Sequence, residues 1–156
     1  MTGSPAVPRP VLVVEDNRDD ARLARHVLAQ AGMGHLVHLV RDGREAADYL
    51  FGLDAGPRAA ALRLALLDIK LPGMDGLELL RRMREELATR SVPVVMFTSS
   101  DQARDRWAAY RLGANSYVVK PVGFDDLSHT LERVVRYWLE VNRPPPAQGS
   151  RPPEAG

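Results

Sequence analysis

The stretch that most constrains the fold of this 156-residue chain is residues 64–80, LALLDIKLPGMDGLELL. Its first part, residues 64–67, is apolar and ends at a carboxylate, Asp68. A Pro-Gly turn comes next, and the pattern predicts a helix that begins near Asp75. A short, nearly continuous apolar run is typical of a strand buried on both faces of a parallel sheet. Open α/β sheets carry functional groups just beyond the carboxyl ends of such strands, so Asp68 is the first candidate functional residue.

Four further short apolar runs predict strands, and helical periodicity fills the segments between them. The five predicted strands cover residues 11–14, 36–40, 64–67, 92–97 and 116–119. Five strands that alternate with five helices predict a doubly wound, five-stranded parallel α/β sheet. Right-handed crossovers would bring the loops after successive strands to one edge of that sheet.

Several local signals fix the expected boundaries. Pro93 must lie at the entry of its strand, because a proline inside a central strand would lose a ladder hydrogen bond. Ser99 and Gln102 form a capping-box pattern for the next helix. Two glycines and a proline predict a loop over residues 52–60. An apolar stripe is expected on the last helix, formed by Phe124, Leu127, Leu131, Val134, Val135 and Trp138.

The ends of the chain differ in composition from its middle. Residues 1–9 are proline-rich and are predicted to be a flexible leader, and residues 142–156, with Pro, Gly and Ser, a disordered tail. Residues 10–141 would form the folded domain. We expect no output domain in this tail, because it is too short to fold as one.

Composition excludes several classes of protein. Twenty-one basic and twenty acidic residues leave a net charge of +1, which gives no electrostatic case for binding nucleic acid or a membrane. The absence of cysteine excludes disulfides, thiolate metal sites and cysteine nucleophiles. The start of the chain lacks a secretory signal, and no apolar run approaches the roughly 20 residues that span a bilayer. A cytoplasmic protein is therefore expected.

Side chains that can take part in a reaction or bind a metal lie where the predicted strands end: Glu15, Asp16, Asp68, Thr98 and Lys120. Three carboxylates brought together repel one another unless a cation intervenes. Lys120 supplies one positive charge, and a divalent metal would supply the rest. Oxygen ligands favour Mg²⁺. Asp19 and Asp20 are interpreted as charges in the first turn of a helix rather than as ligands.

Five motifs occur in a fixed order: VEDN at 14–17, LDIKLPGMDG at 67–76, TSS at 98–100, GA at 113–114 and YVVKP at 117–121. With these motifs the chain, over about residues 10–141, resembles the response-regulator receiver domains of two-component signalling. The resemblance implies the flavodoxin-like (βα)5 fold. It also implies a phosphoacceptor protein rather than an enzyme, with a histidine kinase as partner.

Carried over by position, the resemblance makes Asp68 the phosphoacceptor. Mg²⁺ would be bound by Asp16, by Glu15 largely through a water, by Asp68, and by the backbone carbonyl of Lys70. Lys120 and the metal would neutralise the transferring phosphoryl oxygens.

The remaining implied roles concern the response to phosphorylation. Thr98 would donate its hydroxyl to the phosphoryl group, and Tyr117 would move inward with it as the switch aromatic. The residues Lys70 and Ser100 would tune a slow self-dephosphorylation. The bond between Lys120 and Pro121 is expected to be cis.

A narrower resemblance is to the single-domain regulators paired with bacterial phytochromes. It rests on the long loop before the central strand, the Tyr137-Trp138-Leu139 segment and the expected absence of an output domain. The implied partner is a bacterial phytochrome kinase. The implied homodimer forms through the fourth helix, fifth strand and fifth helix.

Three other functions compete with this interpretation. A phosphohydrolase of the haloacid dehalogenase type needs an aspartate two residues after the nucleophile, where this chain has Lys70. A nucleotide or flavin binder would need a glycine-rich loop after the first strand, where this chain has acidic residues. A structural decoy that binds partners without phosphorylation is disfavoured by the intact residue set, and only a labelling assay excludes it.

Overall fold

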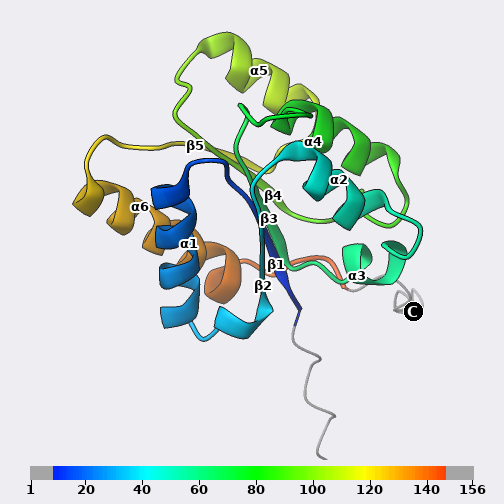
Figure 1. Cartoon of the computed structure of the whole chain (residues 1–156), viewed down its shortest axis with the longest axis horizontal. Coiled ribbons are helices and arrows are strands. Elements are labelled where there is room, and N and C mark those ends of the chain that lie inside the picture. Colours follow the sequence, from blue (N-terminus) through cyan, green and yellow to red (C-terminus); the bar gives the residue numbers. More distant parts are fainter. Residues whose placement is uncertain (1–8, 147–156) are drawn as a thin grey trace, which may run out of the picture.

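A computed structural model of the chain describes residues 9–146, and a parallel sheet forms the centre of the fold (Figure 1). The strands are β1 (Val11–Val14), β2 (Val37–Val40), β3 (Leu64–Leu67), β4 (Val94–Thr98) and β5 (Ser116–Val119). Their order in space is β2-β1-β3-β4-β5, with every pairing parallel. This arrangement confirms the predicted five-stranded, flavodoxin-like sheet. The order reverses between β1 and β3, the place where such folds carry their functional sites.

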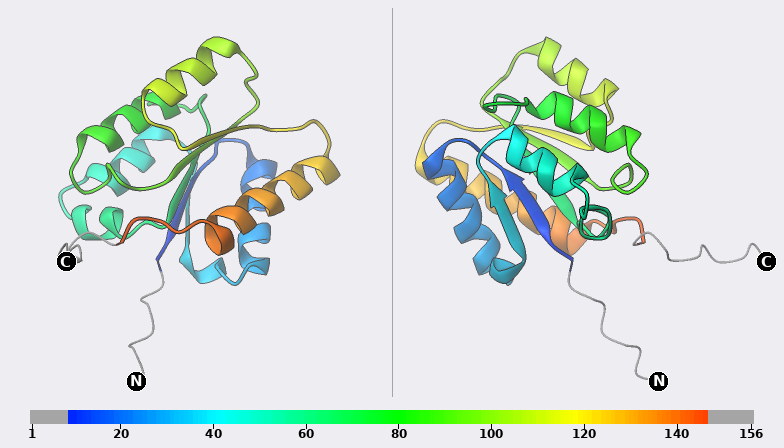
Figure 2. Two further views of the ribbon diagram at one scale, coloured as in Figure 1. Left: turned by 180° about the vertical axis from the view of Figure 1, so that it is seen from behind. Right: turned by 45° about the vertical axis from the view of Figure 1, so that its right-hand side comes forward.

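Helices cover both faces of the sheet. They are α1 (Arg18–Gln30), α2 (Gly43–Phe51), α3 (Gly56–Ala60), α4 (Gly76–Glu85), α5 (Ala103–Arg111) and α6 (Phe124–Arg136), with short helical turns η1 (Gly34–Leu36) and η2 (Tyr137–Val141). Figures 1 and 2 show α1 and α6 on one face and α2, α4 and α5 on the other. Within residues 9–146, no helix has both the length and the apolar character needed to cross a bilayer.

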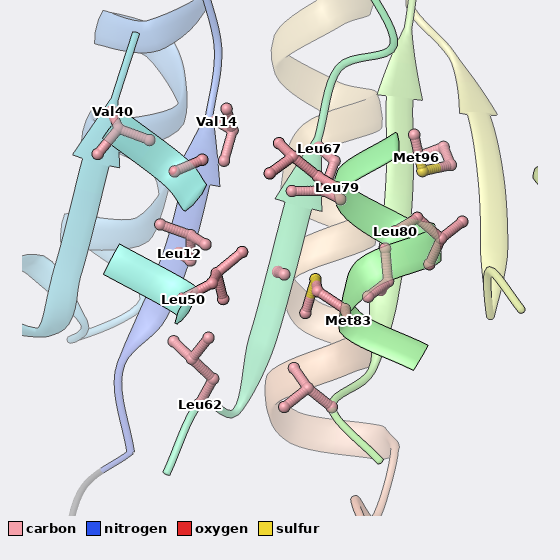
Figure 3. Close-up of a cluster of buried hydrophobic side chains, with 14 of the residues drawn as sticks. Leu12, Val14, Val40, Leu50, Leu62, Leu67, Leu79, Leu80, Met83 and Met96 are labelled. Atoms are coloured by element: carbon pink, nitrogen blue, oxygen red, sulfur yellow. The ribbon is translucent and has the colours of Figure 1, made fainter. Parts of the chain in front are cut away.

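Two apolar clusters hold these layers together, because alternate residues of a strand point to opposite faces. Leu12 of β1 and Leu67 of β3 pack toward α2 and α4, where Leu50 and Met83 meet them (Figure 3). On the other face, residues such as Val13 and Leu66 pack against α1 and α6. Every residue of β1 and β3 is buried, as expected for strands at the middle of a parallel sheet.

The local signals near two predicted boundaries act as expected. Asp75 caps α4, since its side chain accepts a hydrogen bond from the backbone N–H of Glu78 at 2.9 Å. Pro93 directly precedes β4, and its carbonyl accepts from the backbone N–H of Ala65 at 2.9 Å. The proline therefore lies at the strand entry without removing a ladder hydrogen bond.

The prediction of a loop over residues 52–60 is wrong in part, because α3 (Gly56–Ala60) forms there. Ala55 and Ala59 are buried at 1% and 0% exposure, so small side chains let this turn settle onto the core. Arg58 ties the turn to α2 by donating from Nε to the carbonyl of Tyr49 at 3.1 Å. A helix this short has no apolar periodicity that the sequence could reveal.

The capping prediction for the helix after β4 is also wrong. The helix, α5, begins at Ala103, and Gln102 at its N-cap makes no capping bond with its side chain. Ser100 takes a similar role, because its hydroxyl donates to the carboxylate of Asp105 and accepts from the backbone N–H of Gln102.

Two further expectations are wrong. Phe124 is expected in the apolar stripe of the last helix, but it is 70% exposed because it is the first residue of α6, whereas Leu131 and Val135 farther along are buried. The bond between Lys120 and Pro121 is expected to be cis, but it is trans.

Residues at both ends of the described range contact the domain. Arg9 donates to the carbonyls of Ala61 and Leu62 at 3.0 and 2.8 Å, and to that of Pro145 at 3.2 Å. The chain after η2 runs past the amino-terminal end of the sheet (Figure 2). The remaining residues of the predicted leader and tail lie outside the described residues.

Arg84 joins three segments at the amino-terminal side of the sheet. It donates to the carbonyls of Gly113 and Val92 at 3.0 and 2.8 Å and to the side chain of Asn115 at 2.9 Å. We expect Arg84→Ala to lower the free energy of unfolding by about 2 kcal/mol, because partly buried carbonyls lose a charged donor. Denaturant titration measures this. The control is Arg81→Ala, which removes exposed ion pairs and should therefore lose less stability than Arg84→Ala. Equal losses would contradict the role of Arg84.

Candidate functional site

The pairing of β1 with β3 places two carboxylates side by side. Val14 and Leu67 are register partners, so Glu15 and Asp68 come after the two strands at the same level. The backbone N–H of Asp68 donates to the carbonyl of Val14 at 3.1 Å. These residues lie at the carboxyl edge of the sheet, as the sequence predicts.

Lys120 reaches this edge from the end of β5. Its backbone N–H donates to the carbonyl of Thr98 at 2.7 Å, which fixes the start of the side chain beside β4. Its ammonium lies 2.6 Å from Oε2 of Glu15 and 3.0 Å from Oδ2 of Asp68. The lysine therefore joins the ends of three strands through one positive charge.

The electrostatics of this cluster leave an excess of negative charge. Burial lowers the pKa of Lys120, but the hydrogen bond and charge of Glu15, with those of Asp20 and Asp68, outweigh it and hold the pKa above its usual value. Burial raises the pKa of Glu15 to about 7, against the lowering effect of Lys120. One ammonium thus stays protonated and does not fully compensate the carboxylates around it.

Asp68 is held firmly but stays in contact with solvent. Its side chain is 11% exposed to solvent. Oδ1 accepts a hydrogen bond from the backbone N–H of Ile69 at 2.7 Å, while Oδ2 faces Lys120. Behind it, the N–H of Gly76 donates to the carbonyl of Ile69 at 2.8 Å, so α4 begins directly against the backbone of the candidate acceptor.

Thr98 and Tyr117 are connected through one residue. Thr98 is 2% exposed, and its Oγ1 accepts a long hydrogen bond, 3.3 Å, from the backbone N–H of Ser100. The hydroxyl of Tyr117 donates to the carbonyl of the same Ser100 at 2.8 Å. The β4–α5 loop therefore lies between the two side chains that the sequence names as a switch.

Two candidate metal-binding residues lie at the rim without joining the lysine cluster. Asp16 and Lys70 are exposed. In the part of the chain that the structure describes, no three acidic or imidazole side chains already converge as a metal site. The donors nevertheless suit Mg²⁺, which binds one or two carboxylates and keeps several waters.

Sequence reasoning missed one member of the cluster, Asp20. It is a first-turn charge of α1, as predicted, but its Oδ2 also lies 2.9 Å from the ammonium of Lys120. Side chains of a helix lean toward its N-terminus. A first-turn acid directly after the strand-end acids therefore points back at the sheet edge, and this was the signal available in the sequence.

Comparison with known proteins agrees with this geometry. The family model described as the response regulator receiver domain matches residues 11–132. The chain is 38% identical over 135 residues to the probable methanogenesis regulatory protein FilR2 of Methanothrix harundinacea, covering 86% of each protein. It is 32% identical over 134 residues to the response regulator Rcp1 of Synechocystis, covering 86% of this chain and 91% of Rcp1.

Solved structures give the same result. The phosphorylated cyanobacterial phytochrome response regulator RcpA matches with a TM-score of 0.80 at 31% identity, covering 89% of this chain and 99% of that one. The Mn²⁺-bound form of Rcp1 matches with a TM-score of 0.80 at 33% identity, and the match covers 88% of this chain and 99% of that one. The chain belongs to the response regulator receiver domain family. It is a receiver domain of two-component signalling, related to the response regulator Rcp1 and to the cyanobacterial phytochrome response regulator RcpA.

Proposed function

We propose that this protein accepts a phosphoryl group from a histidine kinase on Asp68. One observation carries the proposal: the ammonium of Lys120 lies 3.0 Å from Oδ2 of Asp68, at the point where the strand order reverses. A carboxylate that stays reachable beside a fixed cation is suited to attack phosphorus and to hold the product.

The transfer exchanges one bond to phosphorus for another. An oxygen of Asp68 forms the new P–O bond, and the P–N bond to the kinase histidine breaks, leaving its electron pair on the imidazole. The ammonium of Lys120 would neutralise one phosphoryl oxygen. The hydroxyl of Thr98 would donate to another, since among residues 9–146 its Oγ1 acts as an acceptor, from the N–H of Ser100, and its proton remains available.

The proposed metal is Mg²⁺, held by Asp16, Glu15 through a water, Asp68 and the backbone carbonyl of Lys70. When bound it would neutralise charge on the phosphoryl oxygens. The chemistry of the donors supports this assignment, because all of them are hard oxygen ligands. The Mn²⁺-bound form of the related Rcp1 adds support from a neighbour.

The proposed switch is the connection from Thr98 through Ser100 to Tyr117. If the Thr98 hydroxyl turns to the phosphoryl group, the N–H of Ser100 loses its acceptor, and the loop that holds the Tyr117 hydroxyl is free to move. Phosphorylation adds about −1.5 to −2 charges and strong acceptors, which is enough to bias such a local choice.

The proposed partners are drawn from the relatives. RcpA, a cyanobacterial phytochrome response regulator, supports a bacterial phytochrome as the cognate kinase. A homodimer is proposed through α5, β5 and α6, which are the fourth helix, fifth strand and fifth helix of the sequence prediction. The exposure of Trp107 (66%) and Tyr110 (51%) on α5 supports it. We place the protein in the cytoplasm as a phosphoacceptor that turns over no separate substrate and slowly loses its own phosphoryl group.

Radiolabelled acetyl phosphate tests the proposal. With Mg²⁺, the wild type and the control Asp54→Asn, an exposed aspartate, should incorporate label, and Asp68→Asn should not. EDTA should abolish labelling of the wild type, because the metal is part of the proposed site. Equal labelling of Asp68→Asn would remove Asp68 from the role, and an unlabelled wild type would favour the structural decoy.

A further inference from the structure

The ammonium of Lys120 has three acceptors, and all three are carboxylates. Oε2 of Glu15 lies at 2.6 Å, Oδ2 of Asp20 at 2.9 Å and Oδ2 of Asp68 at 3.0 Å. A lysine ammonium carries three N–H donors and no acceptor, so these contacts use every donor it has. Two of the acceptors, Glu15 and Asp20, come from the segment after β1, and the third is the candidate phosphoacceptor.

We infer that Asp20 is a positioning residue for phosphoryl transfer: with Glu15 it fixes the ammonium of Lys120 so that the third N–H points at Asp68. The inference rests on the proposed role of Asp68 as acceptor. Asp20 would not touch the phosphoryl group itself. It would act through the lysine.

The surroundings leave the lysine few other choices. Its side chain is 5% exposed, and that of Glu15 4%. The ring of Phe97 lies with its centroid 5.7 Å from the ammonium nitrogen and offers no lone-pair acceptor. With little room for solvent, the direction of each N–H is set by the carboxylates.

Asp20 is itself held in place by α1. Asn17 caps this helix by accepting from the backbone N–H groups of Asp19 and Asp20, each at 3.0 Å. The next residue, Ala21, is buried against the core, so the first turn of the helix is anchored on both sides of Asp20. Its side chain keeps only 18% of its exposed area.

This arrangement has a consequence for the reaction. When Asp68 carries a phosphoryl group, a phosphoryl oxygen can replace its Oδ2 as the third acceptor. The ammonium need not turn, since Glu15 and Asp20 keep the other two donors. A cation already oriented toward the developing charge costs no reorganisation during transfer.

The sequence offers a clean spectroscopic reporter. Lys70 and Lys120 are the two lysines of the chain, and the other basic residues are arginines. A ¹⁵N spectrum of lysine ammonium groups therefore contains two signals. Lys70 is exposed and serves as an internal reference, whereas the ammonium protons of Lys120 should exchange slowly with water.

The test compares Asp20→Ala, Asp20→Asn and the neighbouring control Asp19→Ala under saturating Mg²⁺. Loss of the acceptor in Asp20→Ala should slow phosphorylation by acetyl phosphate on the order of tenfold, while Asp20→Asn, whose amide oxygen can still accept, should stay within about twofold of the wild type. Asp19→Ala should match the wild type. The Lys120 ammonium signal should stay protected in the wild type and Asp20→Asn and lose its protection in Asp20→Ala.

Several results would overturn the inference. Asp20→Ala could react as fast as the wild type with a protected lysine signal, which would leave Asp20 without a role. Both Asp20 variants could react faster, which would make Asp20 a repelling charge instead. Failure of the wild type to label would overturn the proposed function as a whole, and so is distinguishable from these results, in which the wild type labels normally.

Discussion

Lys120→Met is expected to lower the free energy of unfolding by about 3–5 kcal/mol, the cost of removing one partner from a buried charge cluster. Methionine keeps the length and apolar stem of the side chain, so the loss reports the ammonium. Without it, the buried carboxylates of Glu15 and Asp68 lose the cation that they share with Asp20. Urea titration at neutral pH measures the change.

The matched control for this prediction is Lys70→Met. Lys70 is exposed, so its replacement should change stability by no more than about 0.5 kcal/mol. Ligands that bind the folded state stabilise it, so Mg²⁺ should raise the melting temperature of both Lys120→Met and the wild type. The rise should be larger for Lys120→Met, because the carboxylates of the variant have lost the ammonium that otherwise compensates them. Equal stability of the two methionine variants would show that Lys120 does not compensate these acids.

Gly76→Ala is expected to cost about 3 kcal/mol of stability and to slow phosphorylation, because no space exists for a side chain at this position. A Cβ on Gly76 would lie 1.9 Å from the carbonyl oxygen of Asp68. Either the start of α4 or the backbone of Asp68 would have to move. The same change would then disturb both the fold and the direction of the acceptor carboxylate.

Thermal unfolding and acetyl phosphate labelling measure the two effects of Gly76→Ala. Gly56→Ala is the control, because a Cβ at Gly56 meets nothing within 4 Å. This variant should be as stable as the wild type or more stable by about 0.4–1 kcal/mol. A Gly76→Ala protein with normal stability would contradict the close approach of α4 to the acceptor strand.

Much of the fold could be predicted because the central strands are apolar on both faces. Residues 64–67 form β3 as expected, and Asp75 caps the next helix. The short α3 could not be predicted, since its alanines form a helical turn only when the core is there to receive them. Phe124 fits the apolar period of α6 yet is exposed, because the period does not show where a helix leaves the sheet.

The candidate site was predictable where strand ends determine it. Glu15, Asp68 and Lys120 meet because parallel strands bring their carboxyl ends to one edge. Asp20 was missed because a first-turn acid has an adequate explanation in the helix dipole. Only the direction of its side chain, toward the lysine at 2.9 Å, separates the two roles.

Borohydride trapping tests the central claim most directly. After reaction with acetyl phosphate and Mg²⁺, reduction of an aspartyl phosphate converts the side chain to an alcohol that peptide mass spectrometry can locate. The proposed mechanism predicts this alcohol at position 68 alone, and none in a sample that was not phosphorylated. An alcohol at another acidic residue, such as Asp16 or Asp20, or no alcohol in a protein that carries label, would contradict the assignment of Asp68 as the phosphoacceptor.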